Sequence, residues 1–339
     1  MPKQKKSAFK PPKNNKTTQD LIPILRVYDN GLFLEEGRVF SRLYSFTDTS
    51  FTIKPKSEQE AIMSQFEAAL NGLSTDSYIK ICCVTLNADV QEKKLQVSAQ
   101  ATGHSDKVIP LVNAYNSLID EVMSKSVTRT DKYLVISTEM TDKDFSVDTA
   151  LAKLDADETV FSEFFRQNNS TFTRVTSEER LELLYNILND NQKNYTFIHE
   201  NGTVSIDWKK LTRSGMNFKD LIAPQYIEFR GSNFNINDKV AESLYINNMP
   251  NKASTEFYTS LSMLPFPSLV SYTVRPVSAK ETTNKIKDLR LSNQTEAEGK
   301  NGPTRKTTKM EEELEAWEQD IQERDQSMFE FQLNVFHFA

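Results

Sequence analysis

The last twelve residues of the chain, from Met328, alternate between two sets of side chains as a β-strand does. One set is Phe329, Phe331, Leu333, Val335 and His337, and the other is Glu330, Gln332, Asn334, Phe336 and Phe338. A side-chain period of two with aromatic and β-branched residues predicts a strand with one buried face. The two phenylalanines of the second set make its last part apolar on both faces, which is typical of an interior strand. We expect this strand to fill a slot between earlier strands, to lead into a further domain, or both.

Residues 20–190 alternate between strand-like and helix-like patterns. Strands are expected at 31–35, 38–47, Ser77–Asn87, Lys132–Thr138 and Thr171–Val175. Helices are expected from a capping box at Ser57 and Glu60 to Asn71-Gly72, at 106–126, at 143–168 and from Ser177 onward. The helix at 106–126 is placed by its apolar positions Val108, Leu111, Val112, Tyr115, Leu118, Ile119 and Val122. This order predicts an α+β fold with ferredoxin-like, split βαβ sheets and helices packed on one face.

The second half of the chain repeats this pattern in reduced form. Residues 191–224 are polar and irregular, and they predict a connector between a first α+β subdomain at 20–190 and a second at 225–339. In the second, strands are expected at 225–230, 239–247 and Leu269–Val277, with a helix at 253–264. This β-β-α-β set predicts a structural echo of the first half, although no residue-level repeat is visible.

Residues 278–327 predict a charged helical hairpin that projects from the second subdomain. Its tip, at 296–308, contains Gly299, Gly302 and Pro303. The return helix has only a thin apolar stripe of Leu314, Trp317 and Ile321, so one side of it should face solvent. Contact with a partner and a plain solvated excursion are both open interpretations of this arm.

Composition adds a basic arm to an otherwise acidic chain. The 339 residues carry a formal net charge of −6 and 26% charged residues. Residues 1–19 predict a disordered arm whose lysines are Lys3, Lys5, Lys6, Lys10, Lys13 and Lys16. The arm could bind anionic lipid or nucleic acid, or only aid solubility. No apolar run reaches the ~18–20 residues that span a bilayer, and the adjacent Cys82 and Cys83 suit a reducing cytoplasm.

The motifs of common active sites do not occur in the sequence. Gly299–Thr307 superficially resembles a phosphate loop, but Pro303 follows Gly302 where that motif requires lysine. His104, His199 and His337 lie far apart and lack metal-ligand spacing. The sequence therefore predicts no catalytic, cofactor-binding or metal-binding residues in this chain, and a protein that is not an enzyme.

Several stretches, in order and over essentially the whole chain, resemble the N-terminal region of the ATPases that energise type IV secretion and conjugation. They are Thr17–Pro23, Tyr28–Gly31, Glu179–Tyr185, Asp220–Pro224 and Met328–Ala339. The form they resemble is the TrbE/CagE-type (VirB-type) family carried by mobile genetic elements of Gram-positive bacteria. In that family a motor domain with a phosphate loop follows the closing strand, and this chain lacks such a loop. The resemblance implies the docking and assembly module of a conjugal-transfer ATPase, with ATP expected only for the missing motor domain.

The resemblance also implies partners and a location. These are the inner-membrane channel proteins of the secretion apparatus, self-association through the full-length ATPase, and a cytoplasmic position peripheral to the inner face of the cell membrane. The alternative is a nucleic-acid-binding accessory protein of a mobile element that uses the basic arm. The residues expected to contact a partner or an anionic surface are the six lysines of the arm with Lys300, Arg305, Lys306 and Trp317.

Overall fold

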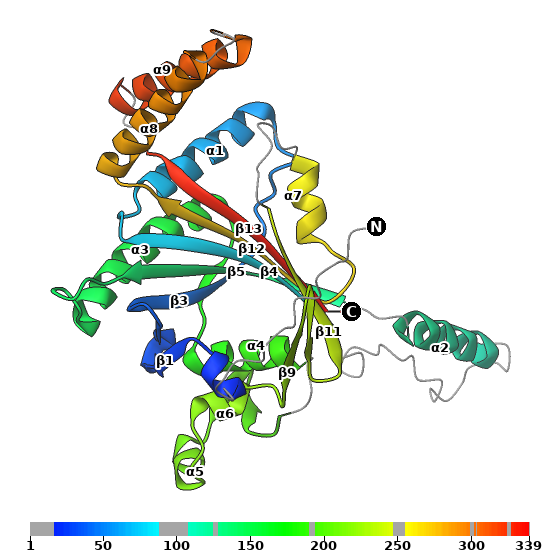
Figure 1. Ribbon diagram of the computed structural model, residues 1–339. Coiled ribbons are helices and arrows are strands. Elements are labelled where there is room, and N and C mark those ends of the chain that lie inside the picture. Colours follow the sequence, from blue (N-terminus) through cyan, green and yellow to red (C-terminus); the bar gives the residue numbers. More distant parts are fainter. Residues whose placement is uncertain are drawn as a thin grey trace, which may run out of the picture.

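The computed structural model describes residues 17–87, 108–124, 128–189, 194–246, 255–298, 302, 304–323 and 327–338. Within these ranges the chain builds one antiparallel sheet of eleven strands, in the order β1-β2-β3-β5-β4-β12-β13-β11-β10-β9, with β6 beside β3 (Figure 1). A separate hairpin, β7-β8, lies outside this sheet. The predicted α+β class is confirmed.

The strands of the sheet are β1 (Ile24–Val27), β2 (Phe33–Glu35), β3 (Val39–Phe46), β4 (Ser77–Asn87), β5 (Thr128–Glu139), β6 (Phe172–Arg174), β9 (Ile227–Arg230), β10 (Asn233–Ile236), β11 (Lys239–Tyr245), β12 (Ser268–Pro276) and β13 (Phe329–Phe338). The separate hairpin is β7 (Phe197–Glu200) and β8 (Thr203–Ile206). The helices are α1 (Lys56–Asn71), α2 (Val108–Ser124), α3 (Val147–Gln167), α4 (Ser177–Asn189), α5 (Trp208–Arg213), α6 (Phe218–Ile222), α7 (Thr255–Ser262), α8 (Ala279–Ala297) and α9 (Arg305–Glu323), with short 3-10 turns η1 (Thr18–Leu21) and η2 (Asp29–Gly31).

The first half forms the split βαβ arrangement that its sequence predicts. β3, α1 and β4 make one unit with β5 inserted between the two strands, and β5, α3 and β6 make the other with β3 between them. Helices α1 and α3 pack on one face over a core that includes Phe40, Tyr44, Ile79, Leu154 and Phe161. Each fully buried side chain of this kind contributes about 1.5–3 kcal/mol through its transfer from water.

The second half forms a reduced version of the same unit, as predicted. β11, α7 and β12 follow one another in the chain, and β13 is inserted between the two strands. The closing strand therefore fills a slot, and Leu333 at its middle is buried. β12 also pairs with β4, with Ser268 opposite Thr85, so the two halves share one sheet across the predicted 191–224 connector.

Helix α4 lies on the face opposite α1 and α3, whereas the sequence predicts helices on one face. Its Arg180 donates hydrogen bonds to the carbonyl and the hydroxyl of Ser41, at 3.0 and 2.9 Å, and stacks 4.0 Å from the ring centroid of Phe33. Leu181 joins a second core around Phe33. The contacts of Arg180 and Leu181 hold α4 against the sheet at β2 and β3.

Three local predictions differ from the structure. Helix α1 begins at Lys56 after Pro55, without a side-chain cap, so the capping box predicted at Ser57 does not form. Strand β10 and the β7-β8 hairpin lie where the sequence predicts only turns or connector. These strands are only four residues long, too short for a period of two to stand out.

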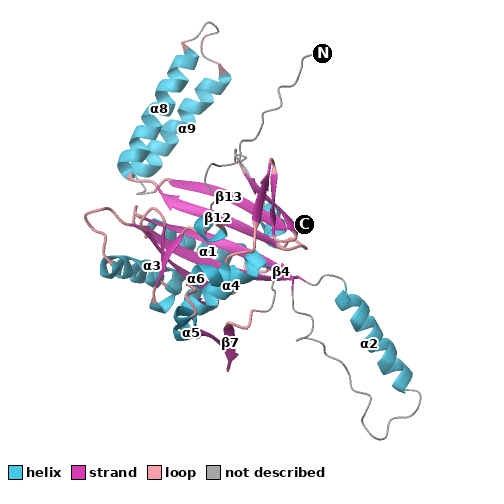
Figure 2. Cartoon of the chain, turned by 60° about the horizontal axis from the view of Figure 1, so that its bottom comes forward, coloured by secondary structure: helices cyan, strands magenta, loops and turns pink. Residues whose placement is uncertain are grey.

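Each half carries an insertion at the same topological position. Helix α2 lies between β4 and β5, and the α8–α9 hairpin lies between β12 and β13. Because β4 and β12 are antiparallel neighbours, the two insertions leave the sheet at opposite ends. Figures 1 and 2 show both standing clear of the sheet, the hairpin at one end and α2 at the other.

Candidate functional site: the two insertions

The α8–α9 hairpin is held together by a small apolar seam and by one branched ion pair. Leu314 of α9 and Ile286 of α8 are buried between the helices. Arg290 of α8 binds Glu311 through Nε at 2.8 Å and Glu318 through both terminal nitrogens at 3.1 Å. These contacts fix the register of the two helices while leaving most of their outer surface exposed.

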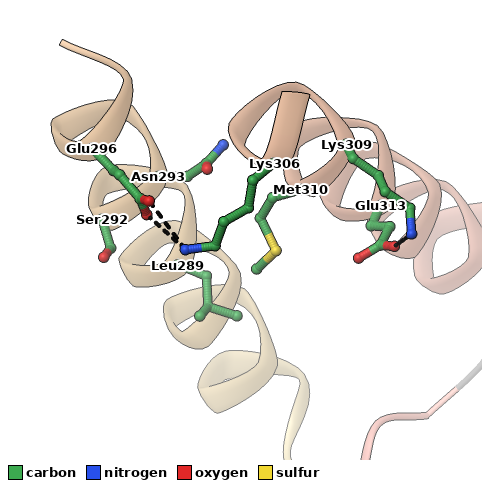
Figure 3. A pocket seen from close by; sticks show the side chains of 8 residues that line it. All are labelled: Leu289, Ser292, Asn293, Glu296, Lys306, Lys309, Met310 and Glu313. Carbon is green, nitrogen blue, oxygen red and sulfur yellow. Dashed lines mark hydrogen bonds and ion pairs between the residues drawn. The ribbon is translucent and has the colours of Figure 1, made fainter. Parts of the chain in front are cut away.

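A hollow of about 310 Å³ lies between the two helices near the hairpin tip. Figure 3 shows Leu289 of α8 and Met310 of α9 pointing into it. At its rim, Lys306 reaches across to Glu296 with its Nζ 3.0 Å from Oε1, and Lys309 pairs with Glu313 on α9 at 3.5 Å. The hollow is therefore an apolar slot with a charged rim, and we call it the hairpin slot (Leu289, Ser292, Asn293, Glu296, Lys306, Lys309, Met310 and Glu313).

The predicted contact residues fall into two groups. Arg305 and Lys306 lie in the first turn of α9, and Trp317 lies about three turns further along the helix. Trp317 is 42% exposed, as a partner contact requires. Lys306 is already paired with Glu296, which reduces the positive charge that the tip offers to DNA or lipid. The six lysines of the basic arm and Lys300 lie outside the described residues.

Helix α2 does not pack on a face of the sheet, although the sequence predicts that the helices do (Figure 1). Leu111, Tyr115 and Leu118 are 70%, 45% and 55% exposed. Their spacing of four and three residues places them on one face of the helix. Both insertions therefore present apolar side chains to solvent, and Leu291 of α8, 64% exposed on the side away from the seam, adds a further one.

A separate group of converging charges lies where α3 crosses β3 and β6. Arg42, whose side chain is 3% exposed, pairs with Asp155 and Glu158, and Arg174 pairs with the same two acids. Tyr44 donates a hydrogen bond to Glu158 at 2.8 Å, and burial raises the pKa of this tyrosine. Two arginines and two acids balance one another, so this cluster acts as a clamp between helix and sheet.

No protein-family model matches this chain, and a search of curated proteins finds no match. Among the described helices, none is long and apolar enough to cross a membrane. Within the same ranges, no three His, Cys, Asp or Glu side chains gather in the manner of a metal site.

The sequence locates the hairpin but not its slot. Ile286, Leu289 and Asn293 are spaced by three and four residues, so they form a stripe along one face of α8. The apolar pattern of this stripe is weak because its third member, Asn293, is polar. Asn293 faces the seam and donates a hydrogen bond to the Thr307 carbonyl at 2.9 Å.

Proposed function

We propose that this chain is a contact and assembly module whose two insertions bind other proteins. The single observation that carries the proposal is that both half-units hold an insertion at the same position, and both insertions expose apolar side chains away from the sheet. Such side chains gain burial only when another molecule covers them. A sheet that presents one contact element at each end is suited to linking two partners.

The cellular setting of the proposal comes from the resemblance to conjugative type IV secretion ATPases. In that setting these residues are the docking module of a conjugal-transfer ATPase. Its partners are the inner-membrane channel proteins, and its place is the cytoplasmic side of the cell membrane. The support for this setting is the ordered match of stretches such as Thr17–Pro23 and Met328–Ala339.

The test uses donor cells of a conjugative element that depend on this chain for DNA transfer. Leu291→Glu places a charge on the outer side of α8, where the leucine is exposed and the fold does not need it. We expect this variant to lower transfer by about tenfold or more, the effect of losing about 1.4 kcal/mol of binding, and to lose co-purification with the channel proteins. Thr283→Glu, an exposed position two turns away on α8, is the matched control and should transfer normally.

Two results would contradict the proposal. One is unchanged transfer and co-purification when both Leu291 and Trp317 are replaced by glutamate. The other is ATP hydrolysis by the purified chain, or ATP binding at about micromolar affinity, since a contact module without a motor has neither activity.

A further inference from the structure

Strand β9 forms one edge of the large sheet, and among the strands that the structure describes it pairs with β10 alone. Arg230 and Asn233 flank the turn at 231–232, so this pair exchanges backbone hydrogen bonds across the hairpin. Phe229 and Phe234 form the next pair, which exchanges none because the two kinds of pair alternate. The N–H and C=O of Phe229 therefore point out of the sheet, toward a position that a further strand can occupy.

Phe229 is also the outer end of a row of aromatic rings that crosses the sheet. Its ring centroid lies 5.9 Å from that of Phe234, which lies 5.5 Å from that of Phe336. Phe338 continues the row 4.8 Å beyond Phe336. The three inner rings are half-buried, whereas Phe229 is 59% exposed. The row thus ends at the edge with one ring in solvent, and an aromatic side chain on an added strand would cover that ring.

The charged residues of β9 match a second copy of the same strand. Glu228 and Arg230 share the face opposite Phe229, and their side chains, 51% and 60% exposed, form an ion pair of 2.6 Å. When a second β9 runs antiparallel to the first, the order of its charges is reversed, so each charge lies opposite its counterpart. Strand β1, at the other edge of the sheet, has Arg26 as its only charged residue and offers no such match.

We propose that two copies of the chain dimerise by antiparallel pairing of their β9 strands about Phe229. The outward N–H and C=O of Phe229 then exchange two hydrogen bonds with those of Phe229 in the second copy. Glu228 of each copy lies opposite Arg230 of the other, and the two aromatic rows join into one. The same patch serves both copies, so the contact is isologous and closes at the dimer.

The charges select the register of this pairing, while the backbone bonds and the burial of Phe229 supply its affinity. Glu228 and Arg230 already neutralise each other within one copy, and exposed ion pairs contribute little. Pairing about Glu228 instead would set two acids opposite each other, and it would meet backbone groups already bonded to Asn235. So short a strand buries less than the ~1,200 Å² of a standard interface, so the dimer is weak. The inference does not depend on the proposed function, because β9 belongs to neither insertion.

The test is sedimentation velocity of the full chain at concentrations up to about 100 µM, the range in which so small an interface is populated. We expect wild type to form a dimer as its concentration rises. Glu228→Arg alone and Arg230→Glu alone each create two like-charged pairs across the symmetry axis, so each should raise the dimer dissociation constant about tenfold or more. An equimolar mixture of these two variants should dimerise as wild type does, because every cross-strand pair then joins opposite charges.

The matched control combines Glu228→Arg with Arg230→Glu in one chain, which restores the self-complementary order and should restore the dimer. Phe229→Pro removes the outward N–H and the ring without breaking a bond to β10, and it should leave the chain monomeric. Circular dichroism melts check that each variant keeps its fold. A monomeric wild-type chain, a mixture that associates no better than its two components, or a dimer that survives Phe229→Pro would each overturn the inference.

Discussion

Gly31 lies at a point where the backbone of η2 meets that of Val175. Its φ is +75°, and a Cβ added there would lie 2.3 Å from the Val175 carbonyl oxygen. Gly202 has a similar φ of +79° but has open space around it. The two glycines therefore separate the cost of the backbone conformation from the cost of the close approach.

We expect Gly202→Ala to lower the free energy of unfolding by about 1–2 kcal/mol, the penalty of a left-handed conformation. Gly31→Ala should lower it by several kcal/mol more, because Val175 and the strand end beside it must move. Chemical denaturation monitored by circular dichroism measures both. Equal losses in the two variants would show that the close approach is absent.

Asp157 is the buried carboxyl whose charge the fold opposes. It is 5% exposed, its Oδ2 has no hydrogen-bond partner in the described part of the chain, and burial raises its pKa above the ordinary value. Between the unfolded and folded pKa values, the folded state binds more protons than the unfolded state. Its contribution to stability is therefore full at low pH and is lost as the pH rises through the folded pKa.

Asp157→Asn removes this loss. We expect the variant to be more stable than wild type by about 1 kcal/mol at pH 7, the order of an unsatisfied buried polar group. The gain should vanish near pH 3, where the wild-type carboxyl is protonated in both states. Denaturation curves at the two pH values provide the comparison, and a gain that grows on acidification would contradict the assignment.

Among the elements, those with strong periodic patterns could be predicted from sequence and those fixed by tertiary contacts could not. Strand β4 lies at its predicted bounds because Ser77–Asn87 is rich in aromatic, β-branched and other apolar residues. The position of α4 depends on Arg180 reaching Ser41 from far along the chain, which no local pattern reveals. For α2 the periodicity correctly predicted a helix, but it could not say whether the apolar face meets this chain's own core or another molecule.

The same limit applies to the candidate site. The charged hairpin could be predicted, because two helical patterns joined by a Gly- and Pro-containing tip lie between two strand patterns. The contact role of Trp317 stays a prediction. The slot could not be predicted, since it depends on how Leu289 and Met310 meet across two helices. The partners themselves stay predictions.

The hairpin should open separately from the sheet. Leu314 is fully buried, but its surroundings are the two helices and not the main core. We expect Leu314→Ala to cost about 2–5 kcal/mol of local stability and to speed amide hydrogen exchange within α8 and α9. Exchange in β4 and β5 should be unchanged; a matching acceleration there would place Leu314 in the global folding unit.

At the scale of the whole molecule, two half-units share one sheet through the β4–β12 pair. Seven residue pairs are in register along this junction, from Ser268–Thr85 to Val274–Ile79. Opening either half would strip one edge of the other and leave its backbone groups unpaired. The halves are therefore expected to unfold together although they are separate units in sequence.

Ile79→Ala in the first half and Val270→Ala in the second test this coupling, because both residues are buried in separate cores. Each should lower the midpoint of one common calorimetric transition by several degrees, as a loss of 1–3 kcal/mol does. Two resolved transitions, each responding to only one substitution, would show independent domains.

Removal of each insertion, with the sheet left intact, tests the contact module most directly. Short glycine-serine loops would replace residues 108–124 in one variant and 279–323 in another, and both would be compared with wild type for thermal melting and for DNA transfer in donor cells. We expect both variants to melt close to wild type, since neither insertion contributes to the main core, and both to lose transfer. Undiminished transfer by well-folded variants would contradict the claim that these insertions are how the protein works.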